Sequence, residues 1–149
     1  MNKTFPELFV SVETVVPTAA QNIFDLLADP SRHSEIDGSG SVKAARTDAP
    51  QRLALGAKFG MSMKLGVPYK ITNTVVEFEE GRRIAWRHFG GHVWRYILEP
   101  IGDGSQTKVT EQFDGNSSKM PIALKLQKAH IRNKKSMEQT LDNLVKLFS

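Results

Sequence analysis

Residues 41–114 constrain the fold more than any other part of the chain, because six strand-like runs follow one another there and short turns separate most of them. Apolar and polar residues alternate within these runs, which is typical of strands with one buried face. Turns such as Glu80-Gly81 and Gly90-Gly91 are short enough to join antiparallel neighbours as hairpins. We therefore predict an antiparallel meander with strands at residues 42–46, 57–65, 69–79, 82–89, 92–99 and 107–113.

Helical patterns flank the meander. A valine-rich strand at residues 8–16 comes first, and apolar residues then recur at helical spacing over 18–28 and, more briefly, from residue 30 or 31 to 36. After residue 118 the helical spacing continues to the end of the chain, with Pro121 tolerable only in the first turn. The order β-α-α-β₆-α predicts an α+β fold. In it, a curved antiparallel sheet of about seven strands wraps around one long C-terminal helix.

Composition sets the outer limits. The chain has 149 residues, 40% of them hydrophobic, which suits one domain spanning residues 1–149. It contains no cysteine, so disulfides, thiolate metal sites and cysteine nucleophiles are excluded, and a reducing cytoplasm is compatible. The first residues lack the apolar stretch of a secretion signal, and no run approaches the roughly 18 apolar residues of a membrane span. We expect a cytoplasmic protein without a transmembrane segment.

The net charge of +4 is unevenly distributed. No acidic residue occurs between Gly115 and Met137, a stretch that could attract nucleic acid or an anionic membrane. A solvated helix face is the favoured interpretation, and nucleic acid is not expected, because no aromatic residues interleave the charges as stacking platforms. The basic residues of this stretch are Lys119, Lys125, Lys128, Arg132, Lys134 and Lys135.

Four segments make the sequence similar to a known family. They are Leu26-Leu27-Ala28-Asp29-Pro30, His33-Ser34-Glu35-Ile36-Asp37-Gly38-Ser39, Trp94-Arg95-Tyr96-Ile97-Leu98-Glu99-Pro100 and Thr107-Lys108-Val109-Thr110-Glu111. Through them the chain resembles, over nearly its whole length, the polyketide cyclase/dehydrase and lipid-transport branch of the START-like (Bet v 1-like, SRPBCC) superfamily. The resemblance implies a helix-grip fold with a hydrophobic cavity between the sheet and the C-terminal helix. It transfers no catalytic residue, because this superfamily has no single catalytic signature.

Side chains on the inward phases of the strands and on the C-terminal helix are the predicted cavity walls. Aromatic residues would supply rigid apolar surface, and methionines would adapt to ligands of different shape, although both types also simply fill cores. The predicted ligand-binding residues are Phe59, Met61, Met63, Tyr69, Ile71, Trp86, Trp94, Tyr96, Val109, Phe113, Asn133 and Met137.

Glu111 is the first candidate for chemistry. It shares its strand phase with Val109 and Phe113, so its carboxyl group is expected to point towards the cavity. Burial would raise its pKa and suit it to general acid or base work on a bound polyketide or steroid-like molecule. The alternatives are an ion pair with Arg87 or Arg95 near the sheet rim, or a bulge that turns the side chain outwards.

Histidines are the other candidates. His88 and His92 flank the Gly90-Gly91 turn in phase with inward-facing neighbours, which would place both imidazoles at the end of the cavity. Exposure to solvent at a hairpin tip is the favoured interpretation for this pair. On the C-terminal helix, His130 and Asn133 belong to an apolar stripe and could reach a ligand. Ile131 could define the buried face instead. The stripe is Leu126, His130, Asn133, Met137, Leu141, Leu144 and Phe148.

No metal or cofactor is predicted. His33, Glu35 and Asp37 need not converge, and the chain has neither a phosphate-binding glycine loop nor a nucleophile elbow. Three functions stay open: binding or transport of a small lipid-like or polyketide-like molecule, an aromatase/cyclase or dehydratase using Glu111, His88 or His130, and an interaction module resembling the Hsp90-activator relatives of the fold. The last predicts a small or collapsed cavity. The chain is expected to be a monomer or homodimer.

Overall fold

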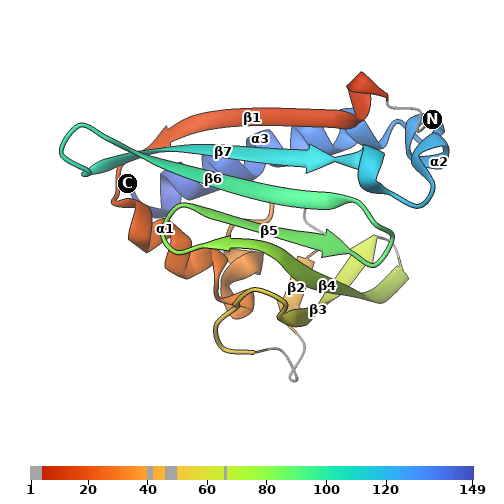
Figure 1. Ribbon diagram of the computed structural model, residues 1–149, viewed down its shortest axis with the longest axis horizontal. Coiled ribbons are helices and arrows are strands. Elements are labelled where there is room, and N and C mark those ends of the chain that lie inside the picture. Colours follow the sequence, from red (N-terminus) through yellow and green to blue (C-terminus); the bar gives the residue numbers. More distant parts are fainter. Residues whose placement is uncertain (1–4, 40–41, 46–49, 66) are drawn as a thin grey trace.

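The computed structural model describes residues 5–39, 42–45, 50–65 and 67–149, with 42–45, 61–65 and 67–70 described by backbone and strand pairing alone. Seven strands and three α-helices are present in this part of the chain, together with three short 3₁₀ segments (Figure 1). In chain order they are η1 (Pro6–Leu8), β1 (Phe9–Val16), α1 (Ala20–Leu27), η2 (Pro30–Glu35), β2 (Val42–Ala45), β3 (Lys58–Leu65), β4 (Val67–Glu79), β5 (Arg83–His88), β6 (Val93–Ile101), β7 (Gln106–Asp114), η3 (Gly115–Ser117), α2 (Pro121–Leu126) and α3 (Ala129–Leu147).

The strands form one antiparallel sheet in the order β1-β7-β6-β5-β4-β3-β2. Strands β2 to β7 pair with their sequence neighbours, as the short turns predict for β3 to β7, and β1 adds to the free side of β7. The pairing register sets Glu111 of β7 opposite Tyr96 of β6, and Trp94 of β6 opposite Trp86 of β5. Opposite residues on antiparallel strands share one face of the sheet, so these side chains converge on the concave side. The α+β helix-grip fold is confirmed, and most strand bounds lie within two residues of the predicted ones.

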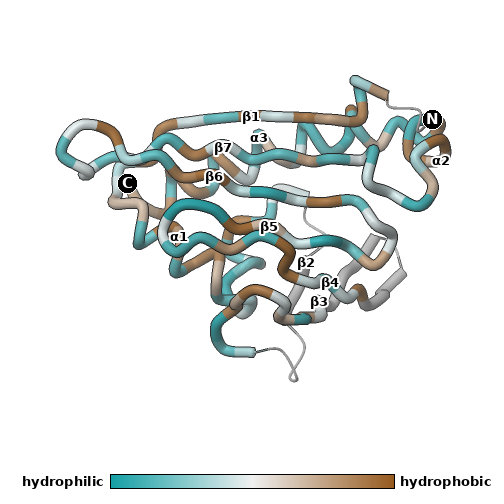
Figure 2. Tube along the Cα trace, viewed as in Figure 1, coloured by the Kyte–Doolittle hydropathy of each residue, from teal (hydrophilic) through white to brown (hydrophobic). Residues whose placement is uncertain are grey.

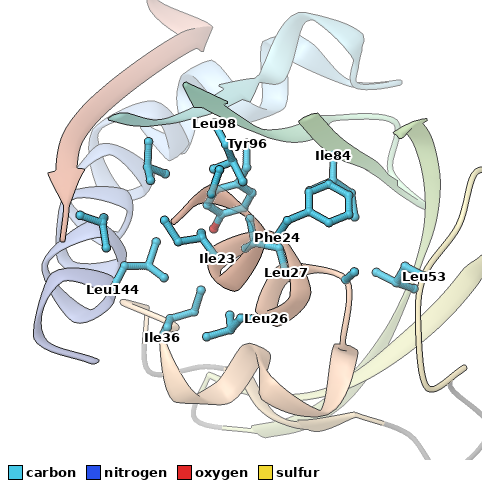
Figure 3. Packing of buried hydrophobic residues seen from close by; sticks show 14 of the residues in the cluster. Ile23, Phe24, Leu26, Leu27, Ile36, Leu53, Ile84, Tyr96, Leu98 and Leu144 are labelled. Carbon is cyan, nitrogen blue, oxygen red and sulfur yellow. The ribbon is translucent and has the colours of Figure 1, made fainter. Parts of the chain in front are cut away.

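The hydrophobic core lies at one end of the sheet, where α1 is inserted between the strands and the last turns of α3 (Figure 3). Ile23, Phe24 and Leu27 recur at helical spacing and are completely or almost completely buried. Phe24 meets Phe78 of β4 edge to face, with ring centroids 5.2 Å apart. Leu144 of α3 packs into the same cluster. Helix α1 therefore fills the space between the sheet and α3 at this end.

The C-terminal helix differs from the prediction. Instead of one long helix, the chain forms α2 and α3, separated at Lys128, whose backbone adopts a left-handed conformation with φ 54°. Helix α2 packs against η1 and η3 at the strand ends, whereas α3 runs along β1 and β7. A straight helix cannot follow both directions, so the chain turns at Lys128. The predicted second helix is likewise a 3₁₀ segment, η2.

In the part of the chain that the structure describes, no helix combines the length and hydrophobicity needed to cross a membrane. The predicted turn at 66–68 is also changed: Val67 and Pro68 already belong to β4, and Gly66 lies outside the described residues.

Candidate functional site

A cavity of about 360 Å³ lies between the concave face of the sheet and the first half of α3. The walls come from the strands β3 to β7, from α3, from Leu124 of α2 and from the segment around η2. Pockets of this size hold small organic molecules, usually against apolar walls with a few placed polar groups. The apolar wall residues are Leu27, Ile36, Phe59, Ile71, Trp86, Trp94, Phe113, Leu124, Ala129 and Met137. The polar ones are His33, Asp37, Ser39, Asn73, His88, His92, Tyr96, Glu111, Arg132, Asn133, Ser136 and Thr140.

Most of the predicted site residues line this cavity. Val109 does not: it is fully buried in the core beside α1. The side chains of Met61, Met63 and Tyr69 lie outside the described residues. The predicted residues found in the wall are Phe59, Ile71, Trp86, His88, Trp94, Tyr96, Glu111, Phe113, Asn133 and Met137.

Glu111 and Tyr96 form a buried polar pair in the cavity wall. The Tyr96 hydroxyl donates a hydrogen bond of 3.0 Å to Oε1 of Glu111, a residue that is only 3% exposed. The second carboxyl oxygen, Oε2, is buried without a hydrogen-bond partner among the described residues. Burial raises the pKa of Glu111 to about 8; the Tyr96 hydrogen bond opposes this in part, and the charge of Asp37 adds to it. At neutral pH the carboxyl group is therefore mostly protonated.

The predicted alternative of an ion pair for Glu111 is not found. Arg95 lies on the outer side of the sheet, where it contacts Glu77 at 2.5 Å and donates a hydrogen bond of 3.0 Å to Gln112. Arg87 donates to the backbone oxygen of Gly91 at 2.9 Å. Adjacent residues of a strand point to opposite faces, so Gln112 and its partner Arg95 are separated from Glu111 by the sheet itself.

His88 and His92 sit at one end of the cavity, not exposed at the hairpin tip as favoured from the sequence. Their rings stack with centroids 4.2 Å apart and planes inclined by 15°. The backbone N–H of Gly90 donates a hydrogen bond of 2.9 Å to Nδ1 of His88. Since Nδ1 is the acceptor, the proton of the neutral ring is on Nε2. Burial lowers the pKa of His88, and burial with the neighbouring His88 lowers the pKa of His92 to about 4. Both imidazoles are therefore neutral at pH 7.

The chain segment after β7 holds this hairpin in place. Lys119 donates its backbone N–H to the Gly90 oxygen at 2.8 Å. Gly91 has φ 101°, and a Cβ there would come within 2.7 Å of the Ser117 oxygen. A residue with a side chain at position 91 would clash with this segment and occupy a strained conformation. The close approach fixes the position of the hairpin that carries the two histidines.

His33 and Asn73 are wall residues that the sequence analysis did not assign to the cavity. His33 donates from Nε2 to the Leu27 oxygen at 2.8 Å, its ring stacks on Trp86 at 5.1 Å, and burial lowers its pKa. Asn73 is 3% exposed and shares the inward phase of β4 with Ile71 and Val75. A polar residue on an apolar phase, the signal that identified Glu111, would have found Asn73. No periodic signal marks His33, because η2 is a short irregular segment.

His130 does not reach the cavity, in contrast to the prediction. It lines a separate hollow beside β1 with Glu7, Val10 and Lys134, and its Nδ1 is buried without a hydrogen-bond partner among the described residues. The turn at Lys128 sets the phase of α3, so that the cavity stripe is Asn133, Ser136, Met137 and Thr140. Leu126, predicted in the buried stripe, is exposed, and so is Ile131.

The loop after η2 closes the cavity against α3. Gly38 donates its backbone N–H to the Thr140 hydroxyl at 2.8 Å, and a Cβ at this position would come within 2.1 Å of the Ser136 oxygen. Only a glycine permits such a close approach of the loop to the helix. Within the described residues, no group of three or more potential metal ligands comes together.

Comparison with known proteins identifies the family to which this chain is similar. The sequence model of the family described as polyketide cyclase/dehydrase and lipid transport matches residues 8–149. The uncharacterized protein Rv0088 of Mycobacterium tuberculosis is 42% identical over 105 residues, which are 70% of this chain but 45% of that protein. The chain therefore spans less than half the length of the curated relatives it matches.

Solved structures show the same fold at low sequence identity. Protein NE0264 of Nitrosomonas europaea is 16% identical with a TM-score of 0.70, covering 97% of this chain and 96% of that one. Ms6760 of Mycobacterium smegmatis is 13% identical with a TM-score of 0.71, covering 95% and 90%. The Polyketide_cyc-like protein Cgl2372 of Corynebacterium glutamicum is 17% identical with a TM-score of 0.66, covering 94% and 90%.

Proposed function

The chain belongs to the polyketide cyclase/dehydrase and lipid transport family, and from this premise we propose that it binds one small, uncharged and largely apolar molecule in the cavity. The observation that carries the proposal is the buried carboxyl group of Glu111, which has one oxygen engaged by Tyr96 and the other without a partner. A buried polar group without a partner is costly, and a ligand that pairs with it recovers that cost.

The protonation state of Glu111 defines the polar group of the ligand. Because Oε1 accepts from Tyr96, the proton of the neutral carboxyl group is available on Oε2 as a donor. A ketone, ester or hydroxyl oxygen on the ligand matches this donor. A carboxylate of the ligand placed next to Glu111 would lie close to the charge of Asp37, which is unfavourable. Arg132 also lines the cavity, but its side chain is exposed. The proposed ligand class is therefore an oxygen-bearing, lipid-like or polyketide-like molecule.

Native mass spectrometry of the protein purified without denaturation tests this proposal, followed by extraction and identification of the bound molecule. We expect one uncharged, oxygen-bearing molecule per chain. Trp86 and Trp94 are the two tryptophans of the chain and both line the cavity, so rebinding is measured by tryptophan fluorescence. Glu111→Leu should weaken rebinding by roughly tenfold, the value of one buried hydrogen bond. Unchanged affinity would contradict the role of Glu111.

A second candidate function is catalysis in the same cavity. Glu111 with a pKa near neutrality suits general acid or base work, and the His88–His92 pair lines the same space. The extracted molecule, incubated with the protein and followed by mass, tests this candidate. Turnover that is lost in Glu111→Gln while binding is kept would favour an enzyme. No mass change would favour binding or transport.

The interaction-module candidate receives less support. It predicts a small or collapsed cavity, whereas a space of about 360 Å³ is present.

A further inference from the structure

The segment joining β7 to α3 forms an exposed corner that the cavity does not explain. We call residues 119–135 the α2 corner. Ten large apolar side chains are exposed in the described part of the chain, and four of them, Met120, Ile122, Leu126 and Ile131, fall within this corner. Ile122 and Leu126 lie four residues apart and so share one face of α2. Figure 2 shows hydrophobic residues on α2, at the end of the molecule beside the N-terminus.

The same corner is strongly basic. No aspartate or glutamate occurs between Gly115 and Met137. Among the described residues, Lys125 is the corner's one member in an ion pair, with Glu7 at 3.1 Å. The remaining positive charges of the corner are exposed, and Arg132 among them also borders the cavity; they are Lys119, Lys128, Arg132, Lys134 and Lys135.

This combination identifies the class of partner. Aliphatic side chains surrounded by lysines are typical of surfaces that lie in the headgroup region of an anionic bilayer. Single-stranded nucleic acid is usually bound by aromatic stacking platforms, and no Phe, Trp or Tyr occurs between Gly115 and Leu147. A duplex would be held by the charges alone and would leave Ile122 and Leu126 unexplained.

The inner side of the corner forms part of the cavity wall. Leu124 and Ala129 line the cavity. Helix α2 itself contains no buried residue, so it covers this end of the cavity without being part of the core. From these observations we infer that the α2 corner docks on an anionic lipid bilayer, with Ile122 and Leu126 entering the headgroup region and the lysines contacting anionic headgroups. Docking in this way brings the α2 end of the cavity to the bilayer surface.

Sedimentation with lipid vesicles tests the inference. The intact chain should bind vesicles of phosphatidylcholine and phosphatidylglycerol in a two-to-one ratio, fail to bind phosphatidylcholine alone, and bind less as salt is added. Each lysine near an anionic surface contributes about fivefold in affinity, so the double variant Lys119→Gln/Lys128→Gln should bind roughly 25-fold more weakly. The variant Ile122→Ser/Leu126→Ser should also lose affinity and should leave more of its binding sensitive to salt.

Matched controls use exposed residues far from the corner. Lys58→Gln/Lys146→Gln removes the same charge, and Leu55→Ser removes an equally exposed apolar side chain. Both should bind vesicles like the unaltered chain. Glu111→Leu should bind vesicles normally too, which separates failure of this inference from failure of the ligand proposal.

Three results would overturn the inference. They are an absence of binding to the mixed vesicles at low salt, equal losses in the corner and control variants, and binding to a short duplex DNA without binding to vesicles. Circular dichroism of each variant shows whether a loss reflects unfolding.

Discussion

The two ends of the space between α3 and the sheet are built differently. At one end, α1 inserts between the layers, and Leu141 and Leu144 of α3 meet a continuous apolar core. At the other end, where α2 lies (Figure 1), none of the described helices is inserted between the layers, and α3 presents Asn133 and Ser136 to the cavity. The comparison shows how one scaffold separates two tasks: the filled end stabilises the fold, and the hollow end tolerates polar groups that a core would exclude.

Among the predictions, we expect the largest change in the free energy of unfolding for a substitution at the filled end. Leu144→Ala removes a fully buried side chain from close-packed surroundings and should lower the free energy of unfolding by about 2–5 kcal/mol. Asn133→Ala, at the hollow end, should lower it by less than about 1 kcal/mol, because the cavity already lies beside it. Urea unfolding of both variants measures the difference. Equal losses would mean that the two ends are packed alike.

Glu111→Gln should stabilise the protein at neutral pH. The pKa of Glu111 is about 8 in the folded protein against 4.5 as its ordinary value, so between these pH values the folded state holds a proton that the unfolded state has released. Stability of the unaltered chain therefore falls as pH rises from 4.5 to 8, by up to about 3 kcal/mol at pH 7. Because glutamine does not titrate, the Glu111→Gln variant should not lose this stability as pH rises. Urea unfolding at pH 5, 6, 7 and 8 measures it.

Glu77 is the matched control on the outer face. The hydrogen bond from Arg95 lowers the pKa of Glu77, so its contribution is present above its ordinary pKa and is lost as pH falls through the folded-state pKa. Glu77→Gln should therefore destabilise at neutral pH, opposite in sign to Glu111→Gln. The same sign for both would contradict the assigned environments.

The turn between α2 and α3 predicts a smaller effect. Lys128 has φ 54°, a conformation that favours glycine, so Lys128→Gly should stabilise by about 0.5–1 kcal/mol. Lys134→Gly, inside α3, should instead destabilise by about 1 kcal/mol. Thermal unfolding of the two variants compares them. A loss in both would indicate that Lys128 contributes through its side chain.

The smallest expected effect on stability comes from the protonation of the His88–His92 pair, and it is measured on the unaltered chain. NMR titration should place the pKa of His92 near 4 and that of His88 below 6.5. Protonation then favours the unfolded state, so this pair makes stability fall as pH drops from 6.5 towards 4. Ordinary pKa values for both rings would mean that they are exposed at the hairpin tip.

Much of the candidate site could be predicted from the sequence. Period-two alternation identified Glu111, Trp86, Trp94 and Phe113 as inward-facing, because side-chain direction in a strand is a local property. Asn73 was accessible to the same reasoning but was not identified. His33 was not, because its position depends on contacts with Leu27 and Trp86 across the molecule.

The sequence by itself determined the antiparallel pairing of the strands joined by short turns, and it indicated which side chains, Glu111 among them, point inwards, since short turns and alternation express local geometry. Only the tertiary structure decided that, among the described residues, Tyr96 instead of an arginine contacts Glu111, that His130 lies outside the cavity, and that side chains do not fill the cavity. These features depend on pairing register, on the turn at Lys128 and on the distance between α3 and the sheet. Each is set by packing among distant segments, which periodicity along one segment does not record.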